Sequence, residues 1–139
     1  MQTKIIPVVG DGYTKEFFFL SIADADMSYQ PHLEVPNVTN AQFALWIGDN
    51  GLSNLNAFKG DYALFCTTSL LKSSGQIALI RQEEEYIIRE AYWTPDKTLL
   101  RVPSDIYEPL ELPTENIRIV AVLDNIIKDR EDLKMVYFD

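Results

Sequence analysis

Hydrophobic residues in this chain occur in short segments that are rich in β-branched and aromatic side chains and are separated by turn residues. Such segments are typical of β-strands, whereas apolar residues at helical spacing are scarce. Only residues 124–136 could form an amphipathic helix. The pattern predicts strands over residues 17–22, 43–47, 62–66, 75–81, 86–93, 99–102 and 117–127.

Turn residues between these segments indicate how some of the strands are connected. The segments 76–81 and 86–92 flank Glu83-Glu84-Glu85 and predict a β-hairpin with a solvated acidic tip. A second turn is predicted at Thr94-Pro95-Asp96-Lys97, because proline presets φ for a turn. Residues 24–40 are polar, contain two prolines and predict a loop, and further prolines after residue 100 argue against a long helix there.

Length, composition and charge exclude several classes of protein. With 139 residues, of which 47% are hydrophobic, the chain is expected to form one globular domain over residues 1–139. Its formal net charge is −9 and its basic residues are not clustered, so direct nucleic-acid binding by this chain alone is not expected. No apolar run approaches the length of a membrane span, and the N-terminus lacks a signal-peptide pattern. We therefore expect a cytoplasmic protein without membrane contact.

Candidate ligands for metals and cofactors are few. His32 is the only histidine and Cys66 the only cysteine, so neither a metal site nor a disulfide framework is expected. Cys66 ends an apolar run and is interpreted as a buried structural thiol. Neither a dinucleotide-binding glycine pattern nor a phosphate-binding loop is present, so we expect no cofactor.

The most informative motif is Gly48-Asp49-Asn50-Gly51, which follows the apolar run 43–47 and precedes Lys59-Gly60-Asp61 and a second apolar run. This order resembles the LexA/CI/UmuD-like self-cleaving peptidases. In that family a strand leads into Gly-Asp-Ser-Met, and the serine attacks the chain's own peptide bond with a lysine as its base. Here Asn50 stands in the serine's place, or Gly51 does if the loop is aligned from the Gly60-Asp61 end. Neither residue is a nucleophile.

The resemblance covers nearly the whole chain. Residues 5–10 resemble the family's opening strand, 75–80 the strand before the lysine, 85–89 the lysine's own strand, 100–112 a proline-containing segment and 117–127 the closing strand. It implies a mainly β fold of strongly bent antiparallel sheets, LexA/signal-peptidase-like and of the β-clip type. It also implies that the first half of residues 124–136 is a strand.

The resemblance places Arg89 where the family has its catalytic lysine. Guanidinium stays protonated in proteins, so Arg89 cannot serve as a base. Ser53 is the remaining candidate nucleophile if the loop is shifted, but it would still lack a base. If the strands pair as in the family, Arg89 meets the loop in a cleft. There it bonds the Asn50 carbonyl or pairs with Asp49 and holds the loop, or it binds a carboxylate or phosphate ligand.

The resemblance implies a catalytically inactive domain that acts by dimerisation and protein binding in transcriptional regulation, of the phage-repressor or SOS-repressor kind. A homodimer interface is expected on the closing strand, at Ile117, Ile119, Val120 and Val122. Two alternatives stay open. One is an active self-cleaving peptidase with a shifted dyad, and the other is a UmuD-like polymerase accessory subunit or an antirepressor. In the family's repressors a helix-turn-helix domain precedes this one, and a longer gene carrying it would favour the first hypothesis.

Overall fold

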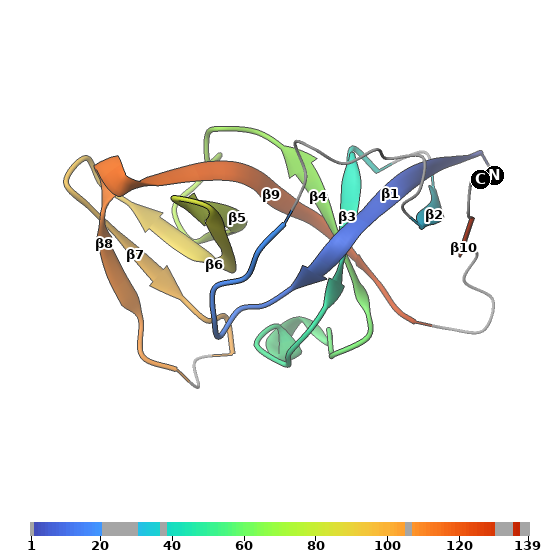
Figure 1. Ribbon diagram of the computed structural model, residues 1–139, viewed down its shortest axis with the longest axis horizontal. Coiled ribbons are helices and arrows are strands. Elements are labelled where there is room, and N and C mark those ends of the chain that lie inside the picture. The colour runs from blue at the N-terminus through green and yellow to red at the C-terminus, as the bar shows by residue number, and fades with distance from the viewer. Residues whose placement is uncertain (1, 21–30, 37–38, 105–106, 130–134, 137–139) are drawn as a thin grey trace.

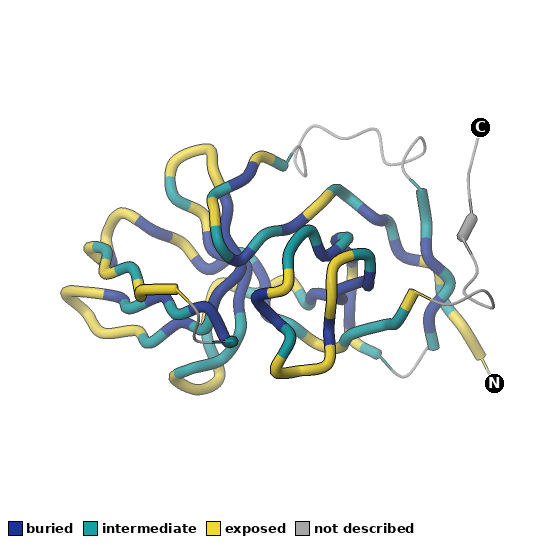
Figure 2. The backbone as a smooth tube through the Cα atoms, turned by 90° about the horizontal axis from the view of Figure 1, so that it is seen from below, coloured by how far each residue is buried: buried dark blue, intermediate teal, exposed yellow. Residues whose placement is uncertain are grey.

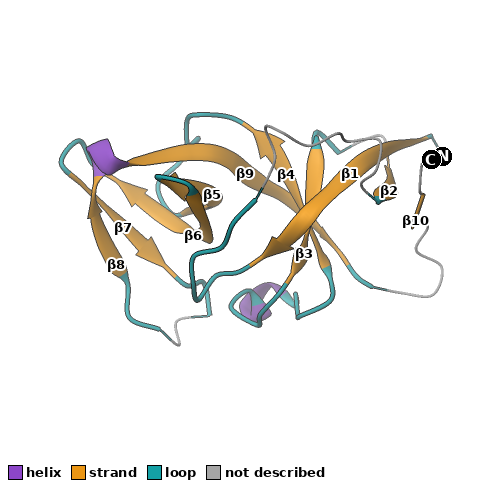
Figure 3. Ribbon diagram, viewed as in Figure 1, coloured by secondary structure: helices purple, strands orange, loops and turns teal. Residues whose placement is uncertain are grey.

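The computed structural model describes residues 2–20, 31–36, 39–104, 107–129 and 135–136. Strands dominate it, and only two single-turn 3-10 helices are present in this part of the chain (Figure 3). The elements are β1 (Thr3–Gly12), β2 (His32–Pro36), β3 (Phe43–Ile47), η2 (Ser53–Leu55), β4 (Tyr62–Thr67), β5 (Gln76–Gln82), β6 (Glu85–Trp93), β7 (Lys97–Arg101), β8 (Leu110–Pro113), η3 (Thr114–Asn116), β9 (Ile117–Ile127) and β10 (Met135–Val136).

The strands form one bent sheet in the order β10-β2-β1-β3-β4-β9-β5-β6-β7-β8. All neighbouring pairs are antiparallel except β1 and β3, which run parallel. The prediction of a mainly β protein is confirmed. The sheet is mixed, however, because β3 lies beside β1 and runs parallel to it.

Strand β9 joins the two ends of the molecule (Figure 1). Its first half pairs with β5, from Ile117 opposite Gln82 to Val122 opposite Ala78. Its second half pairs with β4, up to Ile127 opposite Tyr62. Both ladders contain a register shift, and such irregularities bend a strand and increase its twist. One 11-residue strand therefore belongs to both halves of the sheet.

Buried side chains form three clusters along the sheet. The first lies in the middle and contains Phe18, Leu45, Leu79 and Ile88. Side chains of β1 to β4 form most of the second cluster, and side chains of β5, β6, β7 and β9 form the third. Figure 2 shows buried residues along the middle of the strands and exposed residues on the loops. Burying a side chain such as Leu45, which is 0% exposed, contributes about 2 kcal/mol.

The predicted strands at 43–47, 62–66, 75–81, 86–93, 99–102 and 117–127 are confirmed to within two residues at their ends. The predicted hairpin is formed by β5 and β6, and its acidic tip, residues 83–85, is exposed. The turn at residues 94–97 is closed by a hydrogen bond from the Thr94 N–H to the Lys97 carbonyl.

Two expectations about local structure were wrong. Residues 32–36 of the predicted loop form β2, because Leu33 and Val35 alternate with polar residues and bury themselves completely, and the prolines of that region lie just outside or at its end. Residues 17–20 form no strand and contribute only one isolated bridge, between Phe18 and Tyr86. Residues 124–127 belong to β9, in agreement with the predicted strand over residues 117–127. Residues 21–22, 24–30, 37–38 and 130–134, which these expectations also covered, lie outside the described part of the chain.

The part of the chain described by the structure contains no helix that is both long and apolar enough to cross a membrane. It also contains no group of three or more side chains suited to holding a metal ion.

Candidate functional site at the Asp49 turn

Residues 48–51, here called the Asp49 turn, directly follow the end of β3 near the centre of the molecule. The Gly48 N–H donates to the Gly12 carbonyl at 2.8 Å, which holds the turn against the end of β1. Ile47 and residues 60–61 exchange two backbone hydrogen bonds of 2.8 and 2.9 Å, which close the neck of the loop between β3 and β4. The turn is therefore fixed at both ends by backbone pairing.

The Asp49 carboxylate binds a segment that lies 35 residues earlier in the chain. It accepts hydrogen bonds from the Thr14 N–H at 2.9 Å, the Thr14 hydroxyl at 2.7 Å and the Lys15 N–H at 3.1 Å. A fourth bond of 3.1 Å comes from the Gly51 N–H and shapes the turn itself, as aspartate side chains often do. Bonds from N–H groups to a carboxylate are stronger than bonds between neutral groups.

Arg89 lies on β6 and binds the same segment through its carbonyl groups. Its side chain is only 3% exposed, and its Nε donates to the Thr14 carbonyl at 2.7 Å. One terminal nitrogen donates to the Leu100 carbonyl at 3.3 Å and the other to the Lys15 carbonyl at 3.5 Å. Burial lowers the pKa of the Arg89 guanidinium, and the negative charge of nearby Asp49 opposes that shift.

Asp49 and Arg89 thus bind opposite polar groups of one dipeptide, Thr14-Lys15. The carboxylate takes its N–H groups and the guanidinium takes its C=O groups. We call residues 13–18 the crossing segment. It continues along β6 through bonds from the Ile88 N–H to the Tyr13 carbonyl at 3.0 Å and between Phe18 and Tyr86, both at 2.8 Å. The cleft between the Asp49 turn and β6 is therefore filled by the protein's own chain.

Asn50 and Gly51, the two positions at which the resemblance would place a serine, are unsuited to a nucleophile in different ways. Asn50 is exposed, and its side-chain oxygen accepts a hydrogen bond of 2.9 Å from the Lys59 N–H. Gly51 is buried, and a Cβ placed there would lie 1.7 Å from the Thr14 hydroxyl oxygen and 3.0 Å from a Val102 methyl group. A serine at position 51 would collide with the crossing segment.

The sequence-based expectation for Arg89 named two partners, the Asn50 carbonyl and Asp49. The Arg89 hydrogen bonds go instead to three backbone carbonyls, and Asp49 acts on the guanidinium through its charge alone. The candidate nucleophile Ser53 begins η2, where its N–H donates to the Asn50 carbonyl at 3.1 Å.

Two residues at this site carried no signal in the sequence. Thr14 sits at the centre of the hydrogen-bond network, yet Gly12-Tyr13-Thr14 resembles an ordinary turn. Ser104 donates its N–H to the Gly51 carbonyl at 3.0 Å, and within the described residues its buried hydroxyl has no hydrogen-bond partner. Neither role could be found without knowing which segments meet across the cleft.

A second Gly-Asp pair opens β4 and is anchored independently. Asp61 is 6% exposed and accepts hydrogen bonds from the Phe58 N–H at 2.9 Å, the Asp129 N–H at 3.0 Å and the Lys128 ammonium at 2.5 Å. Burial by itself would raise the pKa of the Asp61 carboxyl. The bonds from Asp129, Lys128 and Phe58, together with the Lys128 charge, outweigh burial and hold this pKa below its ordinary value.

The residues expected at a dimer interface on β9 differ in their exposure. Ile117, Ile119 and Val122 are 4%, 6% and 6% exposed and belong to the third core cluster. Val120 is half-buried against the first cluster. Along residues 117–120 the edge of β9 facing β4 carries no strand ladder, since that ladder begins at Ala121.

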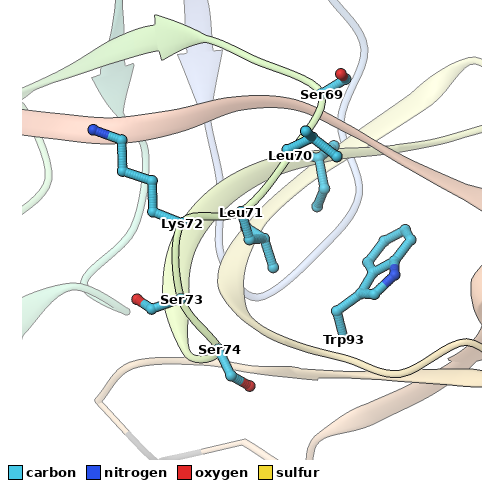
Figure 4. A pocket seen from close by; sticks show the side chains of 8 residues that line it. Ser69, Leu70, Leu71, Lys72, Ser73, Ser74 and Trp93 are labelled. Carbon is cyan, nitrogen blue, oxygen red and sulfur yellow. The ribbon is translucent and has the colours of Figure 1, made fainter.

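An open groove of about 380 Å³ lies beside this part of β9. We call it the β9 groove, and its lining consists of Ser69, Leu70, Leu71, Lys72, Ser73, Ser74, Trp93 and Ile119. Leu70 and Trp93 are 75% and 41% exposed, which is high for large apolar side chains. In Figure 4, Leu70 and Leu71 face Trp93, whereas the Lys72 amine points away from them.

Comparison with known proteins adds no family to this picture. A scan against protein-family models finds no match for the chain, and neither does a search of curated proteins.

Proposed function

We propose that this chain is a catalytically inactive LexA-like domain that acts by self-association and protein binding in transcriptional regulation. The observation that carries the proposal is the Thr14-Lys15 dipeptide held between Asp49 and Arg89. In the family that the sequence resembles, the chain's own segment meets a serine and a lysine at this place. Here the corresponding groups are hydrogen-bonding groups, and they hold the segment without a nucleophile or a base.

Nucleophilic attack needs a nucleophile and a base within hydrogen-bond reach of each other. Arg89 remains charged, and its nitrogen atoms are occupied by carbonyl oxygens. Gly51 has no room for a side chain, and the Asn50 side chain is bonded to the Lys59 backbone. These contacts support a site that stabilises the fold.

The absence of self-cleavage can be tested directly. We expect the full chain to remain intact during prolonged incubation at alkaline pH, as judged by mass spectrometry. Fragments that end between Val9 and Lys15 and increase with time would contradict the proposal. A Ser53→Ala variant then decides the alternative, because a shifted dyad that used Ser53 would lose those fragments in this variant.

The self-association surface that we propose is the start of β9 together with the β9 groove. Ile119 belongs to both, and Leu70 and Trp93 offer exposed apolar surface next to it. Large exposed apolar side chains beside a polar rim are typical of protein interfaces. A symmetric dimer would place each of these residues near its counterpart in the second copy.

Sedimentation of the full chain at high micromolar concentration tests this surface. We expect a homodimer for the wild type and a monomer for Leu70→Glu, because the new charge would be buried in the interface. The matched control is Leu55→Glu on η2, where the side chain is 42% exposed and lies outside the groove. Circular dichroism confirms that both variants are folded. A monomeric wild type, or equal dissociation by both variants, would exclude this surface.

A further inference from the structure

Two arginines face each other on the hairpin side of the sheet, away from the Asp49 turn. Arg81 on β5 and Arg118 on β9 are direct partners in the antiparallel ladder, and both are exposed. Directly opposed side chains in such a ladder lie on the same face, about 5 Å apart at Cβ. Like charges in this position destabilise the sheet. The chain as a whole has a net charge of −9, so this repulsion between two positive side chains is local. Another interaction must offset it for the pair to be favourable.

The two arginines line a hollow of about 340 Å³ together with Glu83, Glu115 and Asn116. Within the described part of the chain, neither carboxylate forms an ion pair with either guanidinium. Arg118 and the Asn116 amide also have no hydrogen-bond partner there, so their N–H groups are available to a ligand.

Arg81 is already oriented for binding. Its Nε donates to the Glu83 carbonyl at 2.6 Å, and its guanidinium carbon lies 5.9 Å from the centre of the Tyr86 ring. A cation over an aromatic face is attracted to it and loses freedom of movement. The two terminal nitrogens of Arg81 have no partner among the described residues and present the planar fork that matches a carboxylate or phosphate.

We propose that Arg81 and Arg118 form an oxyanion-binding site, with Asn116 as an additional donor, that takes a carboxylate or phosphate group. A bound oxyanion would offset the repulsion between the two guanidinium groups and satisfy their free donors. Glu83 and Glu115 border the hollow and repel a dianion more than a monoanion, which favours a carboxylate over a doubly charged phosphate. The site is separate from the Asp49 turn and does not depend on the proposed function.

Nuclear magnetic resonance of the isotope-labelled full chain tests the proposal. Sodium acetate and sodium phosphate are added in separate titrations near neutral pH, with sodium chloride keeping the ionic strength constant. We expect the Nε–H signals of Arg81 and Arg118 to shift along a saturating curve. The buried Arg89 serves as an internal control that does not move. Saturation by acetate identifies a carboxylate site and saturation by phosphate alone a phosphate site, whereas linear shifts with both anions would overturn the proposal.

Three variants show whether the two arginines act together. Arg118→Gln is expected to weaken saturation at Arg81 at least about tenfold, because one of the two guanidinium forks is lost. Arg118→Lys should fall between this variant and the wild type, since lysine keeps the charge without the fork. Lys59→Gln is the matched control, because it removes the same charge from an exposed position outside the hollow and should leave binding unchanged. Equal binding by Arg118→Gln and the wild type would refute a shared site.

Discussion

Two of the three Gly-Asp pairs in this chain, Gly48-Asp49 and Gly60-Asp61, stand at the two ends of one loop and differ in their partners. Both carboxylates accept hydrogen bonds from backbone N–H groups. Asp61 also pairs directly with the Lys128 ammonium, which fastens the end of β9 to the start of β4. Among the described residues Asp49 has no such direct ion pair, and the Arg89 guanidinium, on which its charge acts, is bonded to carbonyl oxygens.

The same dipeptide sequence, Gly-Asp, therefore stabilises the fold in two different ways. At Asp61 the carboxylate closes an ion pair between two neighbouring strands. At Asp49 the charges of Asp49 and Arg89 are both directed at a third segment, and each satisfies one set of its backbone groups. Removal of either charge at the second site would leave peptide groups of the crossing segment without partners, which costs more than the loss of the half-exposed Lys128 ammonium from the first site.

The glycines of the two turns are also required for different reasons. Gly51 is required because Thr14 and Val102 occupy the space of a side chain. Gly60 has open space around it, but its φ of +100° is unfavourable for any other residue.

The largest expected effect is that of Gly51→Ser. The added side chain must displace Thr14, so we expect the free energy of unfolding to fall by about 3 kcal/mol. Gly60→Ala meets no steric obstacle and should cost only about 1–2 kcal/mol through backbone strain. Urea denaturation of both variants measures the difference. A Gly51→Ser protein as stable as the wild type would show that the crossing segment does not pack tightly against the turn.

Asp49→Asn is expected to cost about 2–3 kcal/mol, because its new NH₂ group would face N–H donors of the crossing segment. Urea denaturation gives this value. Hydrogen exchange at the amides of Thr14 and Lys15 gives a local measure, and we expect faster exchange there in Asp49→Asn but not in Asp61→Asn. Equal acceleration in both variants would mean that the two turns are coupled and not independent anchors.

The contribution of Asp61 to stability should be recognisable by its dependence on pH. Its pKa is lowered in the folded protein, so its stabilising contribution is fully present above the unfolded-state value of about 3.9. That contribution is lost as the pH falls through the lower folded-state pKa. The difference in unfolding free energy between the wild type and Asp61→Asn should therefore be constant near neutral pH and shrink in acid. A difference that grows on acidification would contradict this sign.

The smallest expected effect is that of Lys128→Met. The Lys128 side chain is 38% exposed and Asp61 keeps its two backbone donors, so a loss of about 0.5–1 kcal/mol is expected. Lys59→Met serves as the control, because Lys59 is exposed and its ammonium has no partner among the described residues. Chemical denaturation of both variants in low and high salt completes the comparison. A cost for Lys128→Met equal to that of Asp49→Asn would remove the distinction between the two turns.

Much of the strand framework was predictable because its signals are local. The β5–β6 hairpin follows from two apolar segments around an exposed acidic tip, and β9 follows from one long apolar run. Strand β2 was missed because only Leu33 and Val35 carry its pattern, and prolines and polar residues surround them. Strand β8 was missed because it is short and ends in Pro113, which an edge position tolerates.

For the candidate site, the sequence indicated Asp49 and Arg89 as residues of one cleft but not what they bind. Their shared partner, Thr14, lies 35 residues from Asp49 and 75 from Arg89, and nothing in its local sequence distinguishes it. The same holds for Asp61, whose ion pair with Lys128 spans 67 residues.

The sequence by itself determined the β-rich character of the chain, most of its strands, and the presence of Asn50 and Arg89 where the resemblance would place a serine and a lysine. Alternation, turn residues and residue identity are properties of neighbouring positions. Only the tertiary structure decided that the crossing segment fills the cleft, that Gly51 must lack a side chain, and that Arg81 and Arg118 meet. These depend on strand order and register, which bring distant residues to within a few ångströms, and no local pattern specifies them.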